Sequence, residues 1–259
     1  MTVFFHKAAP NSPLKAQSSE ELTLELRGQL VRTRVRVNRR AKRFILRVDP
    51  VERVLNITSP SKRGIPEALA FARSSAVWIC DELNAVPAAT PFADGVAFPF
   101  LGRTIKIANH DSARRRTLLD ENTLLVGGDA AHVNRRVMDW LRKQARSHIT
   151  TRVDQYTTQL EKAAGRISVR DTKSRWGSCS SDGTLSFSWR IILAPEAIFD
   201  YVVAHECAHL VHMNHSPSFW TVVASLNVDA KKASVWFHEN GADLHRWGVL
   251  GADTAPHQV

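Results

Sequence analysis

Residues 205–215, HECAHLVHMNH, place four histidines and one glutamate within eleven residues. His205 and His209 are four positions apart, so on an α-helix they lie on the same face, about 6 Å apart along the axis. Two imidazoles at this spacing can bind one metal ion, and Glu206 lies beside their line of approach. Its carboxylate could reach a water molecule on the open side of the metal. Two histidine ligands with an adjacent glutamate base predict metal-dependent hydrolysis.

A third histidine ligand requires the chain to leave the helix and return. His215 lies ten residues after His205, which is too far to share its face on a straight helix. Asn214 tolerates a left-handed turn better than most residues, and Ser216-Pro217 disfavours continuation of the helix. We therefore expect a turn at this point that brings His215 back to the metal.

Two other residues compete for the third position. His212 shares the helical stripe but lies about 10 Å along the axis from His205, too far unless the helix bends. Glu239 is a carboxylate that a second helix could supply. A helix with no metal is the remaining alternative, but buried histidines without partners would cost about 1–3 kcal/mol each. Imidazole ligation suits zinc, so we expect one zinc ion on His205, His209 and His215.

Three residues before this helix could contact a substrate. Arg175 and Arg190 could stabilise an oxyanion or hold a substrate carboxylate. They could equally brace the local hairpin by pairing with Asp171 or Asp182. Trp176 could line a subsite, although a tryptophan there more often belongs to the core.

Hydrophobic periodicity predicts the elements that position these residues. Pro195 begins the histidine-bearing helix, since proline suits the first helical position. Residues 166–170 and 184–193 are predicted strands on either side of a turn at Asp182-Gly183, which indicates a short antiparallel sheet. The later strand would be an edge to which an extended peptide could add. Residues 130–165 carry apolar side chains every three or four positions and predict one long amphipathic helix.

The amino-terminal half has a different pattern. Apolar and polar residues alternate from Leu30 onward, which predicts half-buried strands, and residues 64–84 have helical spacing. We therefore expect an α+β protein with a tail or peripheral arm at 1–28 and a small β-rich domain at 29–128. The histidines would lie in a second domain at 129–250, followed by a carboxy-terminal tail at 251–259.

Charge is distributed unevenly between the halves. Residues 1–150 hold 25 Lys+Arg against 14 Asp+Glu, a net +11, and residues 151–259 hold 10 against 11, a net −1. The excess suits a nucleic-acid or polyanion surface, or simply a solvated face of arginine-rich strands, because no aromatic residues interleave with the arginines. No apolar run approaches 18 residues, so we expect no membrane span. Three unpaired cysteines suggest a reducing, cytoplasmic location.

Five short motifs lie between residues 174 and 220: RWGSC, WR, LAP, HExxH and NHSxxFW. Together this segment resembles the YgjP-like zinc metallopeptidases, a zincin family. The resemblance implies a zincin-like metallopeptidase domain after the β-rich domain, with an active-site HExxH helix. It also implies that His205, His209 and His215 bind zinc and that Glu206 is catalytic. The substrate would be a peptide or protein.

Three other functions remain open from the sequence. One is a metal-dependent nucleotide (nucleoside triphosphate) hydrolase, in which the arginine-rich domain grips phosphates. Another is a DNA-associated repair protease of the Spartan-like type, in which the basic half follows DNA. The last is a structural zinc module, against which Glu206 argues, because a structural site does not require a glutamate beside its first histidine.

Overall fold

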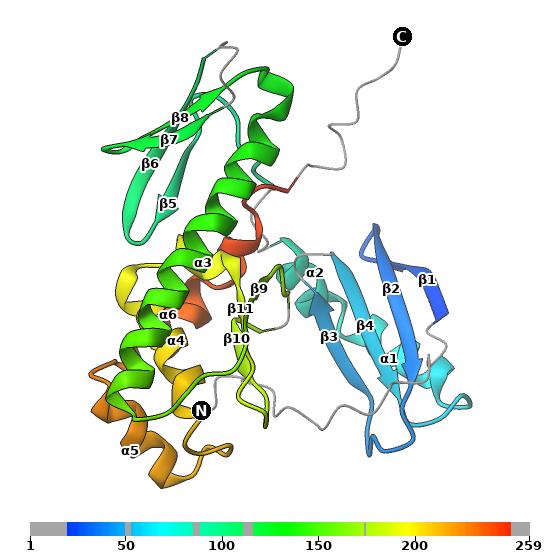
Figure 1. The fold of residues 1–259 in the computed structure, drawn as a ribbon. Helices are drawn as coiled ribbons and strands as arrows, with labels where there is room; N and C mark the ends of the chain where they lie inside the picture. Colours follow the sequence, from blue (N-terminus) through cyan, green and yellow to red (C-terminus); the bar gives the residue numbers. More distant parts are fainter. Residues whose placement is uncertain (1–19, 50–52, 85–88, 111–115, 174, 250–259) are drawn as a thin grey trace. The chain divides into compact units, whose positions relative to one another are not determined.

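The computed structural model describes residues 20–49, 53–84, 89–110, 116–173 and 175–249 (Figure 1). The chain divides into two units, one within residues 9–88 and a larger one that includes residues 89–259. Each unit has its own hydrophobic cluster. The architecture is mixed α+β, as predicted, with the histidine cluster in the helical part of the larger unit. Among the described residues, no helix is long and apolar enough to cross a membrane.

The smaller unit is a four-stranded sheet with two helices. Its strands are β1 (Glu20–Leu26), β2 (Gln29–Val37), β3 (Ile45–Asp49) and β4 (Val54–Ser59), in the order β1-β2-β4-β3. Only β2 and β4 run parallel. The helices are α1 (Ile65–Ser74) and α2 (Ala76–Asn84). Alternate strand residues such as Val31, Val35 and Ile57 join α1 and α2 in one core, so the intervening residues point to the other face of the sheet.

Strand β1 lies within the segment expected to be a tail. Leu24 and Leu26 alternate with exposed residues and are buried in the core, which secures β1 against β2 over the whole of its length. Residues 1–19 of that expected tail, and the expected tail at 251–259, lie outside the described residues.

The larger unit contains two small sheets and most of the helices. One sheet has the order β5-β6-β8-β7, from β5 (Ala97–Phe100), β6 (Arg103–His110), β7 (Thr117–Asp120) and β8 (Thr123–Gly127). The other has the order β10-β11-β9, from β9 (Ile167–Arg170), β10 (Gly177–Cys179) and β11 (Leu185–Ser188). Its helices are α3 (Val133–Gln159), α4 (Glu196–Ala208), α5 (Pro217–Ser225) and α6 (Ala230–Asn240), with 3-10 turns η1 (Ala130–His132), η2 (Trp189–Leu193) and η3 (Ala242–His245).

The first of these sheets belongs to the same core as the histidine-bearing helix. Ile105 and Leu124 are fully buried in one cluster with Val137 and Leu141 of α3. The division between the two units therefore lies before residue 89, whereas the alternating pattern alone placed it after residue 128. Strand periodicity shows which residues are buried but not which core receives them.

The three-stranded sheet differs from the expected arrangement at its edge. β11 pairs with β10 antiparallel and with β9 parallel, so it is the central strand. The expectation that the segment 184–193 forms an edge strand is therefore wrong: β9 and β10 are the two edge strands, and the sheet is mixed rather than purely antiparallel. The segment is also shorter as a strand, because η2 follows it directly with all five side chains buried.

Helix α4 is buried on nearly every side. Pro195 precedes it, and Glu196 provides the negative charge that favours a first helical turn. Every residue from Tyr201 to Ala208 is buried, which is the pattern of a central rather than a surface helix. Its polar side chains are therefore held in place by their surroundings.

Candidate metal centre

Helix α4 and the turn after it bring three histidines together. His205 lies in the last turn of α4, and His209 is the residue at which the helix ends. The chain then turns, and Ser216 accepts a hydrogen bond from the Phe219 backbone N–H at the start of α5. His215 is held between these two helix ends. The expectation that Asn214 adopts a left-handed backbone conformation is wrong, because its φ is not positive. Its side chain instead accepts a hydrogen bond from the Ser216 N–H at 3.3 Å.

The ligand atoms of the three histidines lie within 4.8 Å of one another. The Nε2 atoms of His205 and His215 are 3.1 Å apart. Two nitrogens that are each about 2.0–2.1 Å from a tetrahedral zinc ion lie about 3.3 Å apart. The spacing of this pair therefore fits a shared metal ion, and the nitrogen donors are of the kind that zinc prefers.

The other ring nitrogens of two histidines have polar partners. His209 Nδ1 lies 2.9 Å from the carbonyl oxygen of His212, so it donates and carries the ring proton. His205 Nδ1 lies 3.4 Å from the Tyr201 hydroxyl. A partner at Nδ1 leaves the Nε2 lone pair available for a metal and fixes the orientation of the ring.

The electrostatic surroundings keep these imidazoles neutral. Burial lowers the pKa of His205 to about 2, with smaller contributions from His209 and His215. Burial also lowers the pKa of His209 and of His215. Neutral imidazole is the form that binds metal, so the cluster has the protonation state of a ligand set at neutral pH.

Aromatic rings support the cluster from α5. Phe219 is fully buried and stacks on His209 at 4.5 Å between ring centroids. Its ring also meets those of His205 and His215 edge-on, at 5.0 and 4.8 Å. Trp220 lies 5.9 Å from His215 and remains 41% exposed. Phe219 thus contacts all three histidine rings from the buried side, and Trp220 lies on the exposed side of the cluster.

Glu206 is a buried carboxylate wedged against the edge strand β10. It is 2% exposed, and a Cβ placed on Gly177 would lie 2.6 Å from its Cγ and Oε1 atoms. Burial raises the pKa of Glu206 to about 8, whereas the charge of Arg175 and a backbone hydrogen bond from Cys179 lower it. A divalent cation on the neighbouring histidines would further favour the ionised carboxylate.

Comparison with known proteins agrees with this geometry. A family model described as "YgjP-like, metallopeptidase domain" matches residues 42–240, which is more than half of the chain. The chain belongs to the YgjP-like metallopeptidase family. It is also similar to the metallopeptidase zymogen abylysin of Pyrococcus abyssi, at 20% identity over 37% of this chain and 92% of that chain, with a TM-score of 0.31. A likeness this low carries no structural argument. No curated protein matches the chain.

The two rival ligands of this YgjP-like chain lie outside the histidine cluster. Among the residues that the structure describes, the group with metal-binding geometry consists of His205, His209 and His215. His212 contributes only its carbonyl oxygen, which accepts the hydrogen bond from His209. Glu239 is exposed on α6 and is not part of the group.

Arg190 and Trp176 serve the core around the site. Arg190 is 5% exposed and donates to both carboxylate oxygens of Asp171, at 2.7 and 3.2 Å. It also donates to the carbonyl oxygens of Leu244 and Trp247. This is the bracing alternative for Arg190, and the brace also reaches the backbone of η3 at Leu244 and the chain just after it at Trp247.

Trp176 stacks between two rings. Its centroid lies 5.2 Å from that of Phe237 and 4.9 Å from that of His245. Arg175, by contrast, is exposed and close enough to Glu206 to lower its pKa. Of the three candidate substrate contacts, Arg175 is therefore the one whose side chain is free to meet a ligand near Glu206.

Sequence reasoning assigned no role to Gly177 and Phe219. Both were visible only as members of short motifs, because nothing in the spacing shows which backbone approaches Glu206 or which ring lies under the histidines. A glycine beside a buried carboxylate is a signal of close backbone approach, but it requires the three-dimensional pairing to be recognised.

Proposed function

We propose that this chain is a zinc-dependent peptidase that hydrolyses peptide bonds in proteins or peptides. The observation that carries the proposal is the convergence of three neutral imidazoles beside a buried carboxylate on the same helix. Three protein ligands leave a fourth position for water or substrate, the arrangement of catalytic rather than structural zinc sites. His205, His209 and His215 would hold the ion.

The chemistry assigned to the protein's own residues is proton transfer. When bound, zinc lowers the pKa of a coordinated water to about 7 and polarises a carbonyl oxygen. Glu206 would accept the proton from that water at its carboxylate and deliver it to the leaving nitrogen. Gly177 and the Cys179 N–H hold the carboxylate in one orientation, which limits the reorganisation that each transfer requires.

Strand β10 would orient the substrate. The Trp176 carbonyl oxygen accepts from the Ser188 N–H of β11 at 2.9 Å, and the Ser180 N–H donates to the carbonyl oxygen of Thr184, just before β11, at 3.0 Å. In an antiparallel ladder successive residues alternate in direction, so the backbone groups of Gly177 point away from β11, toward the outer edge. An extended peptide can add to such an edge through main-chain hydrogen bonds, next to Glu206.

Hydrolysis of peptides is preferred over the two other enzymatic functions, nucleoside triphosphate hydrolysis and DNA-associated proteolysis. Membership in a metallopeptidase family favours a peptide bond over a nucleoside triphosphate as the target. The arginine-rich strand β2 precedes the residues that the family model matches, so it does not define the reaction. A purely structural zinc site would not require Glu206 to be buried against β10.

The test is peptide hydrolysis by the zinc-loaded protein. We expect cleavage of unfolded casein or a mixed peptide library, loss of cleavage with a chelator, and recovery when zinc is added back. Glu206→Gln should retain zinc and lose activity by 10²-fold or more, whereas the matched Glu239→Gln on exposed α6 should behave as wild type. Wild-type cleavage by Glu206→Gln would refute the assignment of the base.

A further inference from the structure

The topology of the smaller unit gathers basic residues at one end of its sheet. β2 and β4 are parallel and end in register at Val37 and Ser59, and β3 begins beside them at Ile45. The β2–β3 and β4–α1 loops therefore emerge at the same end. Seven exposed cations lie there, which we call the basic end: Arg36, Arg39, Arg40, Lys42, Arg43, Lys62 and Arg63.

The charge of the basic end is not neutralised within the unit. None of its seven members forms an ion pair with another part of the chain that the structure describes. The loops that carry them, residues 38–44 and 60–64, contain no acidic residue.

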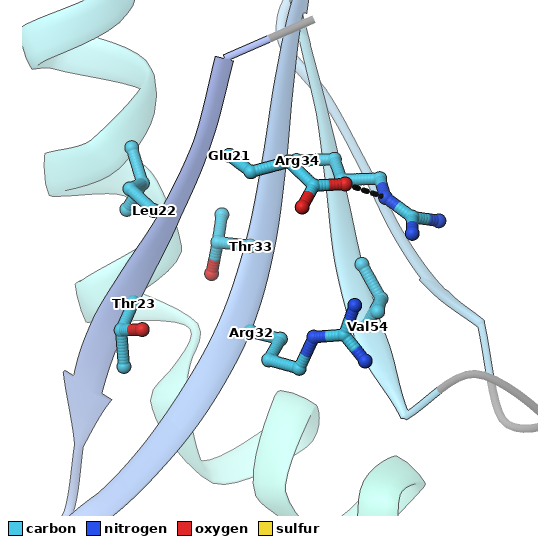
Figure 2. A pocket seen from close by; sticks show the side chains of 7 residues that line it. All are labelled: Glu21, Leu22, Thr23, Arg32, Thr33, Arg34 and Val54. Atoms are coloured by element: carbon cyan, nitrogen blue, oxygen red, sulfur yellow. Dashed lines mark hydrogen bonds and ion pairs between the residues drawn. The ribbon is translucent and has the colours of Figure 1, made fainter.

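A row of arginines continues from the basic end along the sheet. Arg32, Arg34 and Arg36 alternate with the buried Val31, Thr33 and Val35, so they share the face opposite the helices. At about 3.3 Å per residue, the row places one cation every 6.6 Å or so over about 13 Å. Figure 2 shows Arg32 and Arg34 on one side of β2, beside Val54 of β4.

Acidic residues lie on the same face to either side of this row, Glu21 on β1 and Asp49 on β3. Glu21 of the edge strand β1 pairs with Arg34 at 2.6 Å, as Figure 2 also shows. That hydrogen bond, with the charge of Arg34, lowers the pKa of Glu21. Arg32 and Arg36 have no such partner among the described residues, and Arg36 donates to the Thr58 hydroxyl at 2.9 Å. The positive potential is thus strongest toward the basic end.

We infer that the basic end and the arginine row bind the phosphate backbone of nucleic acid without sequence preference. Seven of the nine residues in this combined surface are arginines, and guanidinium forks match phosphate oxygens bidentately. A line of regularly spaced cations complements a polymer that carries one anion per repeat. In the part of the chain that the structure describes, the open face has short polar side chains such as Thr23, Asn56 and Thr58 and no aromatic ring on which a base could stack.

An anionic membrane fits this surface less well. Membrane attachment by a polybasic surface is strengthened by apolar or aromatic side chains on the same face. On the face of the arginine row, the exposed large apolar side chains among the described residues are the aliphatic Leu30 and Ile45. The exposed aromatic residues Phe71 and Trp78 lie on α1 and α2, which cover the face of the sheet opposite the arginine row. One flat membrane could not contact both, whereas a nucleic acid needs only the basic side.

The test is fluorescence anisotropy of the full chain with two labelled 20-bp DNA duplexes of unrelated sequence. We expect both to bind with similar Kd, about 10⁻⁶ M or tighter at 50 mM salt, and more weakly as salt rises. The combined charge reversal Arg39→Glu, Arg40→Glu and Arg43→Glu should weaken binding at least ten-fold. It should also reduce the slope of log Kd against log salt by about 2.7, because each of the three lost phosphate contacts contributes about 0.9 to that slope.

The matched control reverses three exposed cations of the larger unit, Arg166, Lys231 and Lys232, with the same change in net charge. We expect less than a three-fold effect on DNA binding. Equal weakening by both triple variants would overturn the proposal, because the attraction would then reflect overall charge alone. Absence of binding at 50 mM salt, or tighter binding to phosphatidylserine vesicles or polyglutamate, would also overturn it. Thermal unfolding checks that each triple variant is folded. If the Arg→Glu triple variant does not fold, the combined variant Arg39→Gln, Arg40→Gln and Arg43→Gln takes its place.

Discussion

Arg190 and Glu206 are both ionisable side chains buried in the same core, but their surroundings differ. Arg190 donates to Asp171 and to backbone carbonyl oxygens, and its guanidinium lies 4.6 Å from the Trp189 ring centroid. Glu206 lies against backbone of β10 on one side, next to three histidines whose ligand atoms lie within 4.8 Å of one another.

These different surroundings indicate a structural role for Arg190 and a catalytic role for Glu206. A buried ion whose hydrogen bonds are all made within the fold contributes to one fixed structure. A buried carboxylate with a raised pKa beside a cluster of imidazole nitrogens with metal-binding geometry is typical of a site that acts on a molecule from outside. Substitutions should therefore affect the stability of the protein at Arg190 and its catalysis near Glu206.

The largest expected effect is on stability at Arg190. Arg190→Met would leave the carbonyl oxygens of Leu244 and Trp247 without a buried donor and would remove the partner of the exposed Asp171. We therefore expect a loss of about 3–5 kcal/mol in the free energy of unfolding. Urea unfolding measures this loss. The control is Arg142→Met, which changes a more exposed cation near the same Trp189 ring. A loss below about 1 kcal/mol would contradict the bracing role.

The second-largest effect is expected on kcat/KM, when one methyl group is added at Gly177. Gly177→Ala would force Glu206 away from β10, because the added Cβ would lie 2.6 Å from the carboxylate. We expect kcat/KM to fall about 10²-fold, the usual cost of a displacement of about 1 Å, with zinc content unchanged. Ser178→Ala, on the next residue of the same strand, should change kcat/KM less than three-fold. Full activity of Gly177→Ala would show that Glu206 is not held by this contact.

A smaller effect should appear in the pH dependence of stability. Burial alone would raise the pKa of Asp171, but the hydrogen bonds and charge of Arg190 outweigh it, and the pKa is lowered overall. The ionised carboxylate therefore stabilises the fold above its unfolded pKa of about 3.9, and this contribution disappears as pH falls through the folded pKa.

Metal-free wild type and Asp171→Asn provide the measurement, by urea unfolding between about pH 6 and pH 2.5. The difference in their free energies of unfolding should be constant above about pH 5 and shrink as the pH falls further. A difference that grows on acidification would have the wrong sign for a carboxyl with a lowered pKa.

The smallest effect is expected at Arg175. Its side chain is exposed, so Arg175→Ala should change the free energy of unfolding by no more than about 0.5 kcal/mol. Its influence on Glu206 is exerted through charge, which salt screens, and we expect a loss of kcat/KM below ten-fold that shrinks at 1 M salt. A salt-independent loss of 10²-fold or more would instead place Arg175 in contact with the reacting carbonyl oxygen.

Local patterns predicted the elements better than their assembly. The helix bearing His205 and the long helix α3 follow from apolar spacing and from Pro195, and both are present. The predicted helix at 64–84 is two helices that meet at Ser75. Which strand lies at a sheet edge, and which core receives β5–β8, depends on contacts between distant segments, and neither periodicity nor turn residues encode these.

The same distinction holds at the site. The spacing of His205, Glu206 and His209 determines their common position on a helix, because α-helical geometry is local. The return of His215 was anticipated, but the turn that achieves it uses the Asn214 side chain rather than a left-handed backbone. The role of Gly177 comes from strand-to-helix packing, for which the sequence provides no local signal.

Zinc content is the most direct test of the central claim, that three histidines hold a metal beside Glu206. Elemental analysis of the purified chain should give one zinc ion per molecule, retained in His212→Ala and lost in His215→Ala. Retention of a full equivalent of zinc by His215→Ala, or its loss from His212→Ala alone, would contradict the account.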